Sequence, residues 1–285
     1  MTSSVGRHTI SRSWELTPRL ISAFAAGVDD PNPRYFDDAR EGGLVGHPGL
    51  AFTFQWNTRH MPGVAVDPVE ARMGVHAWAD IRYARLFRQG DVITAQGRLI
   101  AARQIAPGTL SVVRITMTDA FGAEVAVMDS ASISRGVRYN HPDEEIEELV
   151  PMPEPSAPPA SAPGWESTLV VPPHAAHTYT ECADIWNPIH TERTVALAAG
   201  LPDIILHGSA TMTICLREVV NRSLGGDPTR VRRLAGQFRA MIIPGERITV
   251  RCLEERETPE GRALFFDCLN ASGQPAIHRG LVVDG

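Results

Sequence analysis

Lysine is missing from this sequence of 285 residues, and all 27 residues of its lysine-plus-arginine count are arginines. This absence excludes Schiff-base and pyridoxal-lysine chemistry, and it excludes a phosphate loop that ends in Gly-Lys-Ser/Thr. The 33 acidic residues outnumber the arginines and give a net charge of −6. The charge balance therefore gives no electrostatic reason to expect nucleic-acid binding.

Long apolar runs and clustered metal ligands are also missing. No run approaches the roughly 18 residues of a membrane-spanning helix, and Met1–Trp14 lacks the apolar core of a signal peptide. The histidines form no His-Glu-x-x-His motif, and the cysteines show no Cys-x-x-Cys spacing. We therefore expect reduced, inert thiols, a cytoplasmic location, no membrane partner, and neither a metal nor another cofactor.

A segment rich in proline, serine and alanine, Pro142–Trp165, divides the chain. Its composition is too poor in large apolar residues to form a core, so it predicts a linker between domains at 1–141 and 166–285. The two halves also repeat each other, because four landmarks recur in the same order. Their offsets are 155, 155, 160 and 151 residues: Asn32-Pro33 with Asn187-Pro188, Gly90 with Gly245, His47 with His207, and Gly122 with Gly273. This order indicates a duplicated domain.

Each half has the same expected order of elements. A short helix leads to the Asn-Pro turn, and a second helical stretch ends near Gly42-Gly43 or Gly200. A longer helix follows, at Gly208–Leu224 in the second half. Three alternating, β-branched runs then predict strands in each half: 91–100, 110–118 and 124–134, and 247–254, 263–270 and 276–283. The pattern predicts an α+β fold of two units, each an antiparallel sheet wrapped around a central helix.

Two short motifs lie on either side of the second predicted helix of the second half. Asn187–His190 reads Asn-Pro-Ile-His, and Ile204–Gly208 ends in Leu-His-Gly. Together they resemble the signature of the MaoC-like, type 2 enoyl-CoA hydratases and 3-hydroxyacyl dehydratases, approximately Asp-x-Asn-Pro-Leu/Ile-His followed by an apolar run and His-Gly. The resemblance implies a hot-dog fold, and the duplication implies its double form. It also implies acyl thioesters of coenzyme A or of an acyl carrier protein as substrates.

The chemistry of such an enzyme explains the residue types. Water addition to an unsaturated thioester needs a base for the water and an acid for the α-carbon, and His190 is the natural proton carrier. Asp184 is the candidate partner, and Asn187 a candidate substrate-binding residue. Backbone N–H groups of Gly208 and Ser209, at the start of the long helix, are expected to stabilise the enolate oxygen.

The second half departs from the signature at the acid. Ile185 stands two residues before the asparagine, where the family has aspartate, and Asp184 comes one residue earlier. Three explanations stay open: a one-residue bulge restores Asp184 to the site, His190 acts with another carboxylate or none, or the site only binds thioesters. Trp186 lies either at the pocket mouth or in the core.

The first half departs in the opposite way. Asp30 keeps the place of the acid, but Tyr35 replaces the histidine. We interpret this half as a degenerate hot dog that completes the acyl tunnel, and we disfavour a composite site of Asp30 with His190. His47 and His207 are interpreted as structural hydrogen-bonding residues.

Arginines are the remaining candidates for ligand binding. Arg230, Arg232 and Arg233 follow Gly225-Gly226, and arginine suits the phosphates of coenzyme A, although such clusters are more often surface charge. The predicted function is a hydro-lyase on enoyl- or 3-hydroxyacyl-thioesters. The alternative is a catalytically weak thioester-binding or partner subunit, with a thioesterase as a distant third. Either a monomer or a homodimer of such chains is expected.

Overall fold

The computed structural model describes residues 4–64, 74–156 and 164–285. The elements of the first half are β1 (His8–Glu15), α1 (Pro18–Gly27), α2 (Leu50–Thr58), β2 (Gly74–Tyr83), β3 (Val92–Ile105), β4 (Gly108–Thr118) and β5 (Glu124–Arg135). Those of the second half are β7 (Trp165–Val170), α4 (Ala175–Ala183), α5 (Arg193–Ala198), α6 (Gly208–Ser223), β8 (Val231–Phe238), β9 (Arg247–Thr258), β10 (Gly261–Leu269) and β11 (Pro275–Asp284). Short 3-10 turns lie at Pro33–Tyr35, Pro188–His190 and Pro228–Arg230.

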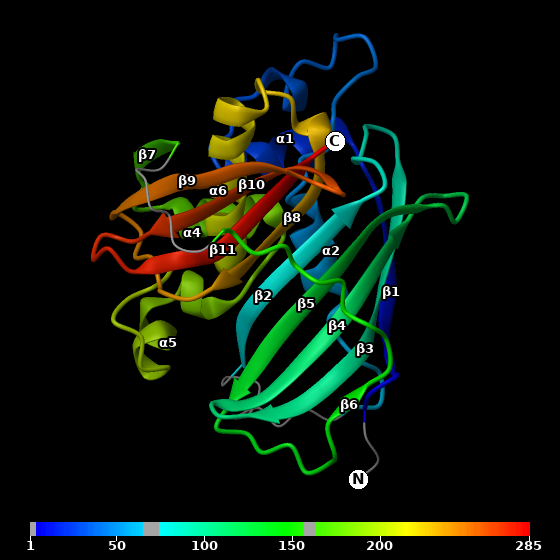
Figure 1. The fold of residues 1–285 in the computed structure, drawn as a ribbon, viewed down its shortest axis with the longest axis vertical. Coiled ribbons are helices and arrows are strands. Elements are labelled where there is room, and N and C mark those ends of the chain that lie inside the picture. Colours follow the sequence, from blue (N-terminus) through cyan, green and yellow to red (C-terminus); the bar gives the residue numbers. More distant parts are fainter. Residues whose placement is uncertain (1–3, 65–73, 157–163) are drawn as a thin grey trace.

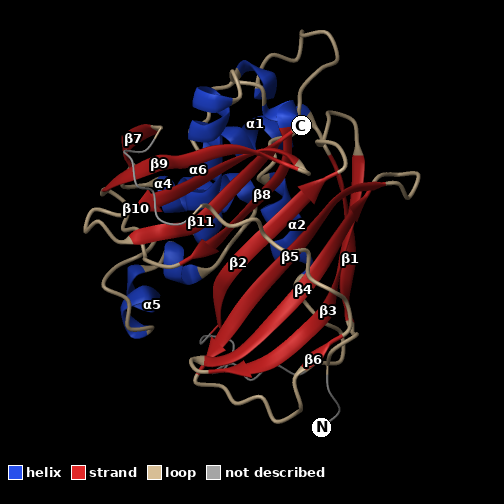
Figure 2. Ribbon diagram, in the orientation of Figure 1, coloured by secondary structure: helices blue, strands red, loops and turns tan. Residues whose placement is uncertain are grey.

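The strands form one continuous antiparallel sheet in the order β1-β3-β4-β5-β2-β8-β11-β10-β9-β7. Read from either edge, the order within a half is the same: the first strand, then the third, fourth, fifth and second. The halves join at the middle, where β2 pairs with β8 from Trp78 opposite Gln237 to Arg82 opposite Arg233. Figure 2 shows the strands as one curved surface with the helices behind it. The α+β fold and the tandem arrangement predicted from the sequence are confirmed.

The central helix of the second half is enclosed by its sheet. Eleven of the sixteen residues of α6 are buried, as expected for a core helix, although Ser209, Thr211, Thr213 and Glu218 among them are polar. Glycine lets the sheet approach the helix closely: a Cβ on Gly236 of β8 would lie 2.7 Å from Cε of Met212, whose side chain would have to shift. The hydroxyls of Thr211 and Thr213 bond to carbonyls one turn earlier, which satisfies these polar groups inside the core.

The described part of the predicted linker lies across the sheet. It crosses the strands as the green segment of Figure 1, and two of its residues form the short strand β6 (Glu144–Glu145) beside β3. Leu149 and Met152 pack against apolar clusters on the outer face of the first and second half, respectively. The composition of the linker predicts that it forms no core of its own. These contacts show that it nevertheless covers apolar clusters of both halves.

The six strands predicted from alternation are confirmed, with ends that differ by a few residues. The second helical stretch expected in the first half is absent from residues 36–43, which form turns. Asp37 explains the difference, because its Oδ1 accepts the Ala39 N–H and so competes with helical hydrogen bonding. The matching stretch of the second half does form a helix, α5.

Candidate active site

The loop that carries the Asn-Pro motif has the same length and the same start in both halves. Asp184 ends α4 in the left-handed conformation with φ of 53°, and Asp29 has the same φ after α1. The loop of the second half therefore contains no extra residue relative to the first. Ile185 matches Asp30 in position, and both side chains are buried, with 4% and 3% exposed.

His190 is held at the end of the 3-10 turn Pro188–His190. Asn187 caps this turn, since its Oδ1 accepts the Ile189 N–H. The His190 ring donates from Nδ1 to the Ile205 carbonyl at 2.8 Å, which leaves the lone pair on Nε2. No hydrogen bond within the described residues occupies Nε2. Burial lowers the pKa of His190 to about 4, so the ring is a neutral base at pH 7.

His207 connects His190 to the start of α6. The two rings stack with centroids 3.6 Å apart and 25° between their planes. His207 is the N-cap residue of α6, and its Nε2 lies 3.2 Å from the Ile185 carbonyl. Burial first, and the neighbouring His190 second, lower the pKa of His207. Both rings therefore stay neutral, and the stack places His190 against the first turn of α6.

The first turn of α6 offers backbone donors. Gly208 and Ser209 begin the helix, so their N–H groups have no partner within it, and no acceptor for them lies among the described residues. Gly208 has no room for a side chain, because a Cβ would lie 2.8 Å from Cδ1 of Phe238. The helix dipole adds to the attraction of these donors for a negative oxygen.

The matching site of the first half is closed. Tyr35 takes the place of His190 and lies 4.8 Å from the His47 ring. His47 Nε2 is 3.4 Å from Asp30 Oδ2, and its Nδ1 accepts the Gly49 N–H. Pro48 has no N–H. The first half thus retains an acid beside an imidazole but has lost the helix donors, and its residues Asp30, Tyr35 and His47 are at most 3% exposed.

Each central helix also holds the Asn-Pro loop of the other half. Thr53 of α2 donates to the Ala183 carbonyl and Asn57 to the Asp184 carbonyl, both at 2.8 Å. Arg217 of α6 donates to the Val28 and Asp29 carbonyls in the same way. Hydrogen bonds of this kind stabilise a protein by about 0.5–1.5 kcal/mol each. The position of His190 therefore depends on both halves of the chain.

The structure does not bring Asp184 to His190. Its side chain is exposed, and within the described residues no hydrogen bond or ion pair joins the two. The one-residue bulge, one of the three explanations left open by the sequence, is absent: the left-handed cap leaves the Asp184 side chain exposed and that of Ile185 buried. Trp186 is 57% exposed, which places it at the surface instead of the core.

Two of the three arginines proposed to bind phosphate are engaged elsewhere. Arg233 is 2% exposed and makes a bidentate pair with Asp80 across the β8–β2 seam, at 2.9 and 2.7 Å, besides binding Glu260. Arg230 pairs with Asp284. Arg232 is exposed. Because a buried, paired guanidinium is not available to a ligand, the expectation for Arg233 is wrong.

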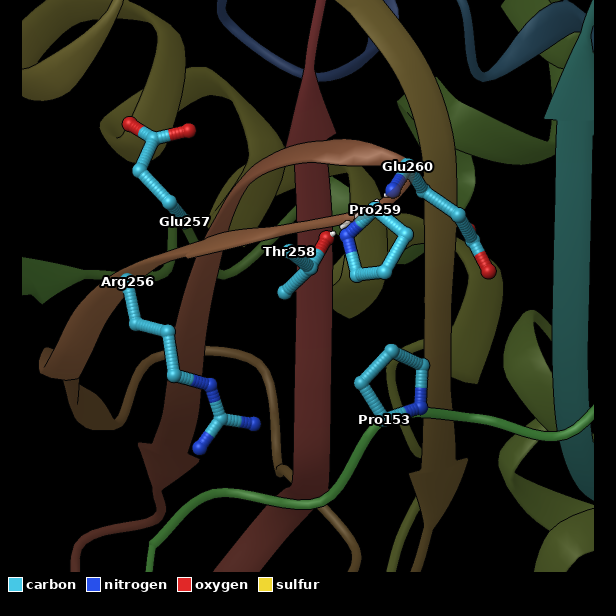
Figure 3. A pocket seen from close by; sticks show the side chains of 6 residues that line it. All are labelled: Pro153, Arg256, Glu257, Thr258, Pro259 and Glu260. Carbon is cyan, nitrogen blue, oxygen red and sulfur yellow. Dashed lines mark hydrogen bonds between the residues drawn. The ribbon is translucent and has the colours of Figure 1, made fainter.

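A surface pocket of about 310 Å³ lies beside the β9–β10 turn, and its lining includes neither His190 nor the start of α6. Figure 3 shows its lining, Pro153 and residues 256–260. Arg256 is bound to Glu254 and to the Glu154 carbonyl, and Glu260 is bound to Arg233. In the described ranges no cluster of three metal-binding side chains occurs, and no helix is long and apolar enough to cross a membrane.

The structure brings the predicted residues His190 and Asn187 together with the start of α6, and it adds an environment of the imidazole that the sequence did not predict. That environment consists of tertiary contacts: the His190–His207 stack, the hydrogen bond to the Ile205 carbonyl, and the hydrogen bond from α2 to the Asn-Pro loop. One signal was present: His47 and His207 recur at matched positions. Both rings do bond to the backbone, through Gly49 N–H and the Ile185 carbonyl.

Comparison with known proteins places this geometry in a family. Residues 156–263 match the MaoC-like domain, and residues 3–128 match the FAS1-like dehydratase domain region. The enoyl-CoA hydratase ChsH3 of Mycobacterium tuberculosis is 35% identical over 92 residues, 32% of each chain. The matched segments span 4% to 32% of the length of the curated relatives.

Two solved structures share the fold over nearly the whole chain. A MaoC-like dehydratase from Phytophthora capsici superposes with a TM-score of 0.82 at 20% identity, over 98% of this chain and 96% of that one. A Mycobacterium tuberculosis protein described as a double hot dog gives 0.62 at 14% identity, over 98% and 95%. The second half of the chain therefore carries a MaoC-like domain, and the whole length has the double hot-dog fold.

Proposed function

We propose that the chain is a hydro-lyase that adds water to, or removes it from, an enoyl- or 3-hydroxyacyl-thioester. The observation that carries the proposal is the position of His190, whose ring has an available Nε2 and stacks on His207, the residue that precedes the uncapped first turn of α6. A neutral base next to backbone donors is the pair of groups that this reaction needs. The family membership of the second half supports the same reaction class.

In the hydration direction, His190 Nε2 removes a proton from water while the water oxygen bonds to the β-carbon. The electron pair of the carbon–carbon double bond moves toward the thioester carbonyl, whose oxygen is held by the Gly208 and Ser209 N–H groups. The His190 imidazolium then returns the proton to the α-carbon. One group can perform both transfers, so the mechanism places no demand on Asp184. Asn187 holds the turn that carries His190.

A second candidate function has one observation in its favour. Ile185 occupies the buried position that an aspartate fills in the first half, so this position supplies no second acid to His190. A chain with this deficit would bind acyl thioesters and hydrate them weakly, as a partner subunit of a larger assembly. In either case, we propose that the first half serves as structural support, with one working site in each chain.

The test follows the loss of conjugated-thioester absorbance when crotonyl-CoA or longer enoyl-CoAs are added. We expect hydration by the wild type, a decrease of about 10²–10⁴-fold in His190→Gln, and no change in Asp184→Asn. Full activity in His190→Gln contradicts the mechanism. Tight thioester binding without hydration at any chain length favours the binding subunit, and a large loss in well-folded Asp184→Asn restores the acid role to that residue.

The remaining expectations about the whole protein are proposals of the same kind. The substrate is carried by coenzyme A or by an acyl carrier protein, the location is cytoplasmic, and one or two chains form the working unit. Size-exclusion chromatography with light scattering measures the last of these directly.

A further inference from the structure

A second histidine, His207, lies face to face with the proposed base. The ring centres of His190 and His207 are 3.6 Å apart, and the ring planes differ by 25°. Nδ1 of His190 donates to the Ile205 carbonyl at 2.8 Å. This single hydrogen bond leaves the ring able to pivot, because the ring torsion of a histidine has broad minima. A second ring at van der Waals distance along one face supplies the constraint that the hydrogen bond does not.

His207 is itself held on both sides of its ring. It is the N-cap residue of α6, and only 3% of it is exposed. Its Nε2 lies 3.2 Å from the Ile185 carbonyl and carries the proton of that contact, because a carbonyl only accepts. The Thr180 hydroxyl oxygen of α4 lies 3.4 Å from the same nitrogen. The ring is therefore a fixed support between α4 and the start of α6.

The other nitrogen of His207 is unpaired. Nδ1 is buried, and no hydrogen bond to it occurs among the described residues. Buried polar atoms are nearly always paired, so an unpaired one requires an explanation. Hydrogen bonding alone does not account for the orientation of this ring, since one of its nitrogens is left bare while its face lies against His190.

The matching histidine of the first half is held differently. Nδ1 of His47, the atom that is unpaired in His207, accepts the Gly49 N–H at 3.0 Å. The His47 ring is tilted by 39° from the ring of Tyr35, and their centres are 4.8 Å apart. The close stack thus belongs to the half that has a histidine at position 190. This difference separates a ring that is oriented toward its neighbour from one that is oriented for its own hydrogen bonds.

The surroundings of the two stacked rings are uncharged. Within 4.0 Å, the described histidines form one ion pair, that of His47 with Asp30, so no described carboxylate pairs with His190 or His207. The titratable group beside them is Tyr179 of α4, whose ring centre lies 5.0 Å from that of His207. Burial raises the pKa of Tyr179, so it stays neutral. Burial also lowers the pKa of His190 to about 4, and the His207 ring covers one face of that base.

We infer that His207 is a positioning residue for His190: its ring fixes the plane of the imidazole and shields one face of it from water. The inference rests on the proposed function and adds a second residue to the same site. With 3% of its surface exposed, His207 acts through His190 and not on the substrate. The role belongs to the ring itself, and the hydrogen bond to the Ile185 carbonyl serves only to hold that ring.

Two variants separate the ring of His207 from its hydrogen bond. His207→Gln keeps an amide donor for the Ile185 carbonyl but removes the ring, whereas His207→Phe keeps a ring without the donor. The matched controls are His47→Gln and His47→Phe, at the repeated position of the first half, where the residue is 1% exposed. The kinetics of enoyl-thioester hydration are measured from about pH 4 to about pH 9, with the melting temperature in parallel.

We expect His207→Gln to lower kcat by about ten- to a hundredfold with little change in KM, because a displaced base loses its reaction geometry. The acid limb of kcat/KM moves from about 4 toward the ordinary histidine value of about 6.5, since water reaches the uncovered ring. His207→Phe retains most of the rate and the wild-type acid limb. The His47 variants lower the melting temperature without moving either property.

Titration of the His190 ring by NMR gives a readout that needs no substrate. A loss of rate in His207→Phe as large as that in His207→Gln overturns the inference, and so does an unmoved pH profile in folded His207→Gln or an equal shift in His47→Gln. A wild-type His190 that titrates near about 6.5 overturns it even where no variant folds. A wild type that hydrates no thioester rejects the proposed function alone, because the NMR titration of the same variants still decides the role of His207.

Discussion

Replacing Ile185 with aspartate tests the reasoning about the missing acid most directly. The first half shows what a carboxylate does at this position: Asp30 Oδ1 accepts the Asn32 N–H at 3.1 Å, and Oδ2 lies 3.4 Å from His47. After burial, the charge of Asp30 is the next largest cause that raises the pKa of Tyr35, which shows that the acid lies close to that ring. Since Tyr35 corresponds to His190, we expect an aspartate at 185 to lie close to the His190 imidazole.

The magnitude of the effect follows from two opposing terms. Ile185 is 4% exposed, so its removal costs about 2–4 kcal/mol of unfolding free energy through lost burial and through a partly desolvated carboxylate. The Asn187 N–H and the His207 ring supply donors equivalent to those of Asp30, which limits this cost. The catalytic gain from a second acid–base group is about 10²–10⁴-fold, or about 3–5 kcal/mol of activation free energy.

The assay is the initial rate of enoyl-CoA hydration, with thermal melting measured in parallel. Ile185→Asn is the control, because it has the shape of aspartate without its proton chemistry. We expect Ile185→Asp to exceed the wild-type rate by about a hundredfold and Ile185→Asn to fall at or below it. A folded Ile185→Asp variant that shows no gain, or an equal gain in Ile185→Asn, refutes the correspondence between the two halves.

Three further outcomes are expected. The pKa of His190 is about 4, so kcat/KM is flat from about pH 6 upward and falls only as pH approaches that value; a fall centred near 6.5 contradicts the burial of this base. The pKa values of His76 and His190 are both lowered to about 4, so the unfolded chain binds more protons below about pH 6.5. As the pH falls from about 8 to about 5, each group therefore lowers the unfolding free energy by about 2 kcal/mol. Urea unfolding at the two pH values measures this loss, and equal unfolding free energies exclude this account. Finally, Arg233→Ala removes the bidentate partner of buried Asp80 and leaves it only the ion pair with Arg82 at 3.2 Å, so the unfolding free energy falls by up to about 3–5 kcal/mol, with no rise in KM for coenzyme A thioesters. A rise in KM without loss of stability restores Arg233 to ligand binding.

Periodic and repeated features of the sequence predicted the fold well. The six strands follow from alternation, because a sheet with one buried face requires it. The 3-10 turn at Pro188–His190 follows from Asn187 and Pro188, whose preferences act over a few residues. The second helical stretch of the first half fails at Asp37, because a local side-chain bond there outweighs the pattern that holds in α5.

The amino-acid sequence by itself determined the duplication, the α+β class, and the presence of an imidazole and a glycine-started helix in the second half. Only the tertiary structure decided which acid meets which imidazole. Asp184 itself adopts the left-handed conformation after α4. Its side chain is exposed to solvent, whereas the side chain of the next residue, Ile185, is buried in the core. Neighbouring arginines differ in the same way, since Arg233 is buried and paired with Asp80 at the β2–β8 seam whereas Arg232 is exposed. Such outcomes depend on contacts between residues far apart in the chain, which no local pattern contains.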